Sequence, residues 1–379
     1  MIGRADDIRE VAVQLQVGAN VVVAAPRRTG KTSVCEAAVG RLRKDGLYTV
    51  EVDLHLISDI DQLAESIVEQ AYANRPLLRK ALHAAKTTGQ TIYEALGMSA
   101  TLKAGHELEG IDLRLLPRIQ KDPVAYLDYA LMLPEKLAAA DGRRLVLFID
   151  EFQDVERIGD NFKHGWSKEL KRKLRASFQK SPHVSFLFAG SLEHMMRVLF
   201  GHSDEPFYNF GSFHSLALIT PEEWRRGLLR KFKRGGTTID PDALASLIEQ
   251  GQGHPRSTML LAQRAHIASV LSDTPHITVA MANASYDEAL RAERPKHEAW
   301  VERIQRLGKP AVNRVALRVA VAIAKRRRPY SEARYPNEVA RALDALRDAG
   351  FVESPTKRQW HVVDPLFEAY LAGLDIPEP

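Results

Sequence analysis

Apolar and polar residues follow two patterns along the first 220 residues. Short runs of consecutive apolar residues predict buried β-strands, and segments with an apolar residue at every third or fourth position predict amphipathic helices. Strands and helices alternate, which predicts an α/β domain with a parallel sheet. The strands are expected at 20–25, 47–54, 144–152, 184–191 and 214–219. The helices are expected at 4–17, from 31 to about 44, 59–73, 123–140, 161–180 and 192–199.

The remaining residues are mostly helical by the same criterion. Helices are expected at 221–234, 240–250, 255–272, 278–291, 310–325, 336–349 and 365–372, and a two-stranded hairpin at 351–354 and 359–363. The last helices and the hairpin follow the order of a winged helix-turn-helix. We therefore expect an α/β domain at 1–219 with an insertion at about 76–122, a helical domain at 220–300 and a winged helix-turn-helix at 301–379.

The turn after the first strand carries the clearest chemical signal. It reads Ala-Pro-Arg-Arg-Thr-Gly-Lys-Thr over residues 25–32, between an apolar run and a helix. Such a turn is typical of a phosphate-binding loop, in which backbone N–H groups surround the anion, Lys31 reaches the phosphates and the Thr32 hydroxyl ligates Mg²⁺. Ala25 replaces the usual glycine, and the alternative is a chance Gly-Lys-Thr after a buried strand. The predicted nucleotide-binding residues of this loop are Pro26, Arg27, Arg28, Thr29, Gly30, Lys31, Thr32 and Ser33.

Two carboxylates, Asp150 and Glu151, end the strand expected at 144–152. Ligands of an open α/β sheet bind at the carboxyl ends of its strands. Asp150 can therefore hold Mg²⁺ together with Thr32, and Glu151 can polarise an attacking water as a general base. The alternative is that the pair caps the helix that follows.

Four further residues are candidates for the same site. Ser191 ends another buried strand and can hydrogen-bond the attacking water or the terminal phosphate, or it caps the helix at 192–199. Arg256 starts a helix, where a cation is unfavourable unless it serves a phosphate, or it is a solvated arginine. Gly3 and Arg4 can form a small cap over a bound base, or they belong to a frayed terminus.

Composition narrows the class of protein. The single cysteine, Cys35, cannot form an internal disulfide, and this fits a cytoplasmic protein. No apolar run approaches the roughly 20 residues that span a bilayer, so no membrane partner is expected. The net charge of +5 permits an acidic partner such as double-stranded DNA. The segment 161–180 is rich in Lys and Arg and is either a solvated face or a surface for DNA phosphates or another subunit.

Taken together, these motifs resemble the archaeal-type P-loop ATPases of the STAND/AAA+ group, relatives of the origin-recognition ATPases. The resemblance rests on Gly3-Arg4, the phosphate-binding loop, Phe148 to Gln153, Phe188 to Ser191, Gly253 to Arg256, and Val363 to Phe367. It implies a P-loop (ASCE) domain, an all-α lid and a C-terminal winged helix. It also implies that Lys31 and Thr32 bind phosphate and Mg²⁺, Asp150 binds the metal, Glu151 is the base, Ser191 is a polar sensor and Arg256 is a lid sensor.

The resemblance implies an ATP-hydrolysing switch that relays its nucleotide state through the lid to a winged helix contacting DNA or a protein partner. ATP is preferred over GTP because the chain has no Asn-Lys-x-Asp motif. No arginine follows Phe210 closely, so Arg175 and Arg197 are the candidates for an arginine acting on a neighbouring subunit. Two alternatives stay open: a nucleotide-stabilised interaction scaffold with little turnover, and an oligomeric DNA-loading or defence ATPase that uses segment 161–180.

Overall fold

The computed structural model describes residues 1–26, 28–76, 121–273, 275–308, 310–332, 335–354 and 359–376. These residues form two compact units. The sheet unit comprises 7–24 and 31–215, and the helical unit comprises 1–6, 25–30 and 216–379. Most of the insertion predicted at about 76–122 lies outside the described residues, and so does Arg27.

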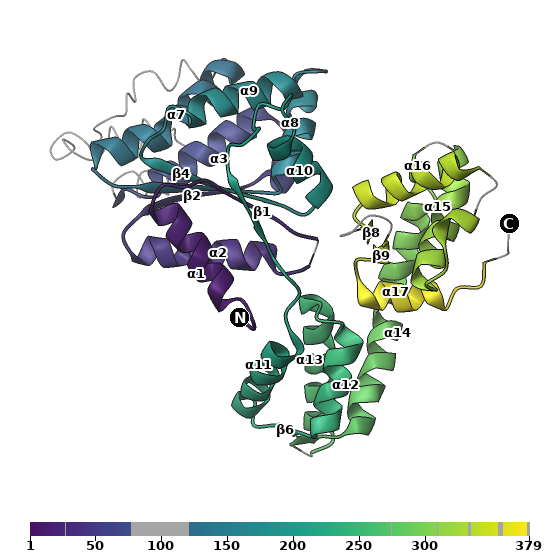
Figure 1. Cartoon of the computed structure of the whole chain (residues 1–379). Coiled ribbons are helices and arrows are strands. Elements are labelled where there is room, and N and C mark those ends of the chain that lie inside the picture. Colours follow the sequence, from purple (N-terminus) through teal and green to yellow (C-terminus); the bar gives the residue numbers. More distant parts are fainter. Residues whose placement is uncertain are drawn as a thin grey trace. The chain divides into compact units, whose positions relative to one another are not determined.

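The sheet unit is built on five parallel strands in the order β2-β3-β4-β1-β5, so the predicted α/β class is confirmed. The strands are β1 (Val21–Ala24), β2 (Tyr48–Asp53), β3 (Leu145–Asp150), β4 (Val184–Gly190) and β5 (Ser212–Ser215). Every residue of β1, β3 and β4 is buried, because helices cover both faces of a parallel sheet. Figure 1 shows α1 and α2 on one face and α3, α7 and α9 on the other.

The helices of this unit surround the strands in chain order. They are α1 (Ala5–Gln16), α2 (Lys31–Lys44), η1 (Leu54–Leu56), α3 (Ile60–Tyr72), α7 (Pro123–Ala140), η2 (Phe152–Asp154), α8 (Val155–Phe162), α9 (Ser167–Phe178) and α10 (Glu193–Gly201). Phe152 on η2 packs against Phe188 on β4 with ring centroids 4.7 Å apart, and Phe200 and Phe207 complete this cluster. Phe152 follows the last residue of β3 by two positions and Phe188 precedes the last residue of β4 by two, so this aromatic cluster packs beside the carboxyl ends of both strands.

Two predicted elements of the sheet unit are wrong in their bounds. Segment 161–180 is not one helix, because α8 ends at Phe162 and α9 begins at Ser167. A Cβ on Gly159 would lie 2.5 Å from the Ser167 Cα, so the missing side chain lets the start of α9 pack directly on α8. The last strand was expected at 214–219 but covers 212–215. Among the described residues it pairs only with β1, whose last residue, Ala24, lies opposite Ser215, so residues 216–219 extend beyond their described partner strand.

The helical unit contains two apolar cores. The first lies among α11 (Pro221–Arg234), α12 (Pro241–Gly251), α13 (Pro255–Leu271) and α14 (Val279–Ile304), with a parallel pair of short strands, β6 (Thr238–Ile239) and β7 (His276–Ile277). The second lies among α15 (Pro310–Ala324), η3 (Pro329–Ser331), α16 (Pro336–Asp348), β8 (Val352–Glu353), β9 (His361–Val362) and α17 (Pro365–Ala372). The predicted hairpin is confirmed, because β8 and β9 pair antiparallel.

Helix α14 is the clearest departure from the predicted helices. The sequence predicts its end at residue 291, but it continues to Ile304 through Pro295. Proline removes one backbone hydrogen bond from a helix and usually ends or kinks it. Here Ala289, His297 and Ile304 are all fully buried on both sides of the proline, so packing carries the helix through. Among the described helices, none has the length and apolar character needed to cross a lipid bilayer.

Candidate active site

Five of the predicted site residues, Lys31, Thr32, Asp150, Glu151 and Ser191, meet within the sheet unit. Lys31 is the first residue of α2, and its Nζ lies 2.6 Å from Oδ1 of Asp150 and 3.3 Å from Oε1 of Glu151. Thr32 donates its hydroxyl proton to Oδ2 of Asp150 at 2.7 Å. Lys31 and Asp150 are both buried. Lys31 therefore forms ion pairs with both carboxylates at the end of β3.

Glu151 is held by the end of the neighbouring strand. Its Oε2 accepts hydrogen bonds from the Ser191 hydroxyl at 2.7 Å, the Ser191 backbone N–H at 3.1 Å and the Gln153 side-chain amide at 2.5 Å. Its backbone has a φ of +50°, a left-handed conformation that costs a non-glycine residue about 1–3 kcal/mol and that occurs often at functional sites. The surrounding contacts therefore fix this carboxylate in one orientation.

The helix-capping alternatives for these residues do not fit the structure. Glu151 precedes η2 but makes no side-chain cap bond to it. Helix α10 has Leu192 at its N-cap position, again without a side-chain cap. Ser191 instead contacts Glu151, so the two strand ends share one hydrogen-bonded group.

The environment of Glu151 keeps it ionised. Burial raises the pKa of its carboxyl group, but the charge of Lys31 and the hydrogen bonds from Ser191 and Gln153 lower it by more. The net pKa of Glu151 lies below the ordinary value for glutamate. A carboxylate that stays deprotonated at neutral pH can accept a proton from a water molecule, as a general base must.

Thr32 and Asp150 also fit a magnesium ion. Their hydroxyl and carboxylate oxygens lie 2.7 Å apart, and oxygen donors are the ligands that Mg²⁺ prefers. Magnesium usually takes only one or two protein ligands and completes its shell with water and phosphate oxygens. Thr32 and Asp150 would supply these two protein ligands.

Residues 25–30 of the predicted phosphate-binding loop, 25–32, belong to the helical unit, and Lys31 and Thr32 belong to the sheet unit. The Thr29 hydroxyl donates to the Pro26 carbonyl at 2.8 Å, and Gly30 has a φ of +90°, which favours glycine. Ala25 is not among the residues with positive φ, so its methyl group strains no left-handed turn. Buried Arg4 donates to the carbonyls of Thr29 at 3.2 Å and Ala217 at 2.7 Å.

The remaining predicted residues lie in different surroundings. Ser33 is exposed in the first turn of α2. Gly3 has a φ of +61° and packs against Ile219. Arg256 pairs with Glu293 at 2.8 Å. Arg28 pairs with Asp364 at 3.0 Å.

Sequence reasoning missed Gln153 and Asp364. Both stand inside segments whose resemblance to a family was noted, but neither had a role, because a glutamine after an acidic pair and an aspartate before a proline are common. The two candidate trans-acting arginines are engaged within the sheet unit. The Arg175 guanidinium lies 4.0 Å from the Phe210 ring centroid and donates to the Pro206 carbonyl, and Arg197 pairs with Glu193.

Comparison with known proteins places this geometry in a known fold. No protein-family model and no curated protein sequence matches the chain. The structure is similar to that of the Walker-type ATPase PABY2304 of Pyrococcus abyssi, with a TM-score of 0.67 and 13% identity over 98% of this chain and 96% of the other. It is also similar to the ORC2 protein of Aeropyrum pernix in its ADPNP-ADP complexes, with a TM-score of 0.56 and 15% identity over 97% and 91% of the two chains. The chain therefore shares the fold of these two structures, which confirms the fold part of the resemblance.

Proposed function

We propose that the protein binds ATP with Mg²⁺ and hydrolyses it. The observation that carries the proposal is the group of Lys31, Thr32, Asp150, Glu151 and Ser191 at the ends of adjacent parallel strands. It combines a cation for phosphate, oxygen ligands for a metal and an ionised carboxylate. The similar ORC2 structure was determined with ADPNP and ADP, which supports an adenine nucleotide as the ligand.

Each residue of the group has a distinct task in this proposal. The Lys31 ammonium turns from the carboxylates to the phosphates, which carry more negative charge. Glu151 accepts a proton from water while the water oxygen attacks the γ-phosphorus and the bond from that phosphorus to its bridging oxygen breaks. Ser191 orients Glu151 by its two hydrogen bonds. A magnesium ion held by Thr32 and Asp150 would neutralise charge on the phosphate oxygens.

Substitution of Glu151 by Gln tests the proposal. Loss of a general base lowers kcat by about 10²–10⁴-fold, whereas ATP affinity is retained because the substituted amide carries no charge to repel phosphate. Steady-state phosphate release and equilibrium binding of a fluorescent ATP analogue measure the two quantities. Glu169→Gln, an exposed glutamate on α9, is the matched control and leaves both unchanged. Full turnover by Glu151→Gln would refute its role as base, and absence of ATP binding by the wild type would refute the site.

The proposed role of hydrolysis is that of a switch. Nucleotide state is relayed from the phosphate-binding loop to the lid, 220–300, and the winged helix, 301–379, which contacts DNA or a protein partner. ATP turnover measured against protein concentration, with and without duplex DNA, separates the possibilities. Turnover per chain that rises with concentration indicates self-association, and a near-zero rate with tight ATP binding indicates the scaffold alternative.

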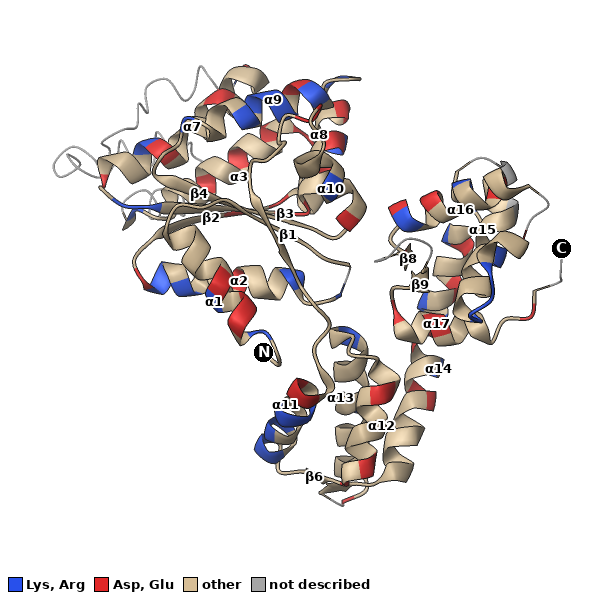
Figure 2. Ribbon diagram, viewed as in Figure 1, with Lys and Arg blue, Asp and Glu red and all other residues tan. Residues whose placement is uncertain are grey.

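A second candidate function is the binding of an acidic partner such as duplex DNA, and a positively charged surface favours it. Helix α11 has six exposed cations, namely Arg225, Arg226, Arg230, Lys231, Lys233 and Arg234. Figure 2 shows the Lys and Arg colour over much of the α11 ribbon. Two of these six, Arg225 and Arg226, lie 3.8 Å from the Glu222 carboxylate. On α9, Lys171 binds Glu156 and Glu205, and Lys173 binds Asp128. The Arg347 guanidinium on α16 is likewise paired with Asp344.

Salt dependence of DNA binding tests this candidate. Contacts between α11 and phosphates predict that binding weakens steeply with salt and that Lys231→Glu/Lys233→Glu reduces the slope of log affinity against log salt by about two. Lys168→Glu/Arg172→Glu on α9 is the matched control for segment 161–180. A role specific to α11 would be contradicted if the wild type bound no DNA, or if the α11 and α9 double variants weakened DNA binding equally.

A further inference from the structure

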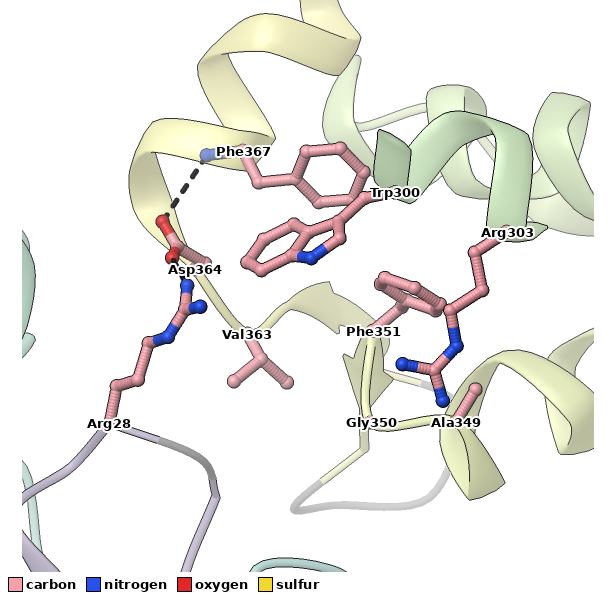
Figure 3. Close-up of a pocket in the computed structure, with 9 residues that line it drawn as sticks. All are labelled: Arg28, Trp300, Arg303, Ala349, Gly350, Phe351, Val363, Asp364 and Phe367. Atoms are coloured by element: carbon pink, nitrogen blue, oxygen red, sulfur yellow. Dashed lines mark hydrogen bonds and ion pairs between the residues drawn. The ribbon is translucent and has the colours of Figure 1, made fainter. Parts of the chain in front are cut away.

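Arg28, in the predicted phosphate-binding loop, forms an ion pair with Asp364, which lies near the C-terminal end of the chain. Within the helical unit, Nη1 of Arg28 lies 3.0 Å from Oδ2 of Asp364, although 336 positions separate the two residues. The Arg28 guanidinium also lies 4.6 Å from the ring centroid of Trp300. Figure 3 shows the three side chains together at the edge of a pocket.

Asp364 has two separate tasks. Its Oδ1 caps α17 by accepting hydrogen bonds from the backbone N–H groups of Leu366 at 3.1 Å and Phe367 at 3.3 Å. Its Oδ2 faces Arg28, and Nη1 of Arg256 lies 4.0 Å away. The Asp364 side chain is only 6% exposed, so it requires cationic neighbours. One carboxylate therefore connects the start of α17 to two arginines that the sequence analysis proposed as phosphate-binding, Arg28 and Arg256.

The Arg28 side chain is placed so that an anion could draw its guanidinium away from Asp364. Its backbone has a φ of +69°, which is unfavourable for a residue with a Cβ, so its contacts hold it there. Its side chain is 32% exposed, so an anion can approach the guanidinium from solvent. Three cations, Arg28, Arg256 and Lys296, surround two carboxylates, Asp364 and Glu293. The group thus has an excess positive charge.

Arg28 also stands close to Lys31 along the chain. Three residue steps span at most about 10 Å, so phosphate bound by Lys31 is within reach of the Arg28 side chain. We propose that Asp364 is a positioning residue that occupies Arg28 in place of phosphate, so that ATP and Asp364 compete for one guanidinium. The inference rests on the proposed ATP binding. Nucleotide binding then frees Asp364 of its partner and changes the contacts at the start of α17.

Competition has a reciprocal consequence. Because coupling free energies are equal in both directions, a carboxylate that opposes ATP must weaken its binding by the same factor by which ATP weakens the ion pair. Substitution of Asp364 by Asn removes the charge, and Asn is as good a helix N-cap as Asp, so α17 keeps its start. We expect Asp364→Asn to bind ATP about fivefold or more tightly, a typical size for such coupling.

The test measures ATP affinity in full-length wild type, Asp364→Asn, Arg28→Gln and the double variant. Competition predicts that Asp364→Asn tightens binding in the wild type but has no effect when Arg28→Gln is present. Asp122→Asn, the N-cap of α7, is the matched control and leaves affinity unchanged. Trp300 gives an independent optical signal. ATP changes its fluorescence as Arg28 leaves the ring, and Trp300→Phe abolishes that change.

The outcomes separate this inference from the proposed function. Wild-type binding with no gain in Asp364→Asn overturns the competition and leaves ATP binding intact. A gain that persists in the Arg28→Gln background also overturns it, because Asp364 would then act by another route. Absence of ATP binding in all four proteins overturns both proposals. A gain that depends on Arg28, together with the Trp300 signal, supports the inference.

Discussion

The buried ion pair of Lys31 and Asp150 makes a quantitative prediction about stability. The side chains are 5% and 9% exposed, and their charged atoms lie 2.6 Å apart. Lys31→Met removes the cation with little change in volume and leaves a buried carboxylate without its counter-charge. Breaking such a pair costs about 3–5 kcal/mol. Asp150 keeps hydrogen bonds from Thr32 and from the backbone N–H of Glu151, so we expect the lower end, about 3 kcal/mol.

Chemical denaturation without nucleotide measures this loss, and the sheet unit should also melt about 6–12 °C lower. Adding Asp150→Asn to Lys31→Met removes the uncompensated charge and should recover about 1 kcal/mol or more. Lys173→Met is the control, because Lys173 pairs with half-exposed Asp128 in the same unit and should cost less than about 1 kcal/mol. Additive effects of Lys31→Met and Asp150→Asn would refute the reasoning, since they would mean that the two charges do not interact.

Three other predictions follow from individual contacts. Ser191→Ala removes a hydrogen bond that lowers the pKa of Glu151, so the acid limb of the kcat profile should move to higher pH, and an unmoved limb would contradict the contact. Gly3→Ala places a Cβ 2.6 Å from Ile219 at a φ of +61° and should lower the free energy of unfolding by about 1–2 kcal/mol or more. Burial lowers the pKa of His297 to about 4, so the unfolded chain takes up a proton first as pH falls. Stability should drop by about 3 kcal/mol between pH 6.5 and 4. His297→Phe should show a smaller drop in the same denaturation series.

The elements that could be predicted from sequence are those specified by local pattern. Helix α7 begins at Pro123 after Asp122 and α11 begins at Pro221 after Thr220, as their capping residues indicate. Buried strands such as β3 are recognisable because a strand covered on both faces is continuously apolar. Strand ends of a parallel sheet meet at one edge, so Lys31, Asp150 and Ser191 could be placed together without coordinates.

Other features depended on contacts between distant residues. Helix α14 continues through Pro295 because packing of its buried face offsets the backbone hydrogen bond that the proline removes. Rules based on local sequence do not include this packing. The break between α8 and α9 depends on the close approach of Gly159 to Ser167. The sequence by itself was enough to propose which residues bind phosphate, since that proposal depends on side-chain type and short spacing. Only the tertiary structure decided that Ser191 holds Glu151 and that Asp364 holds Arg28, because those partners meet through folding of segments far apart in the chain.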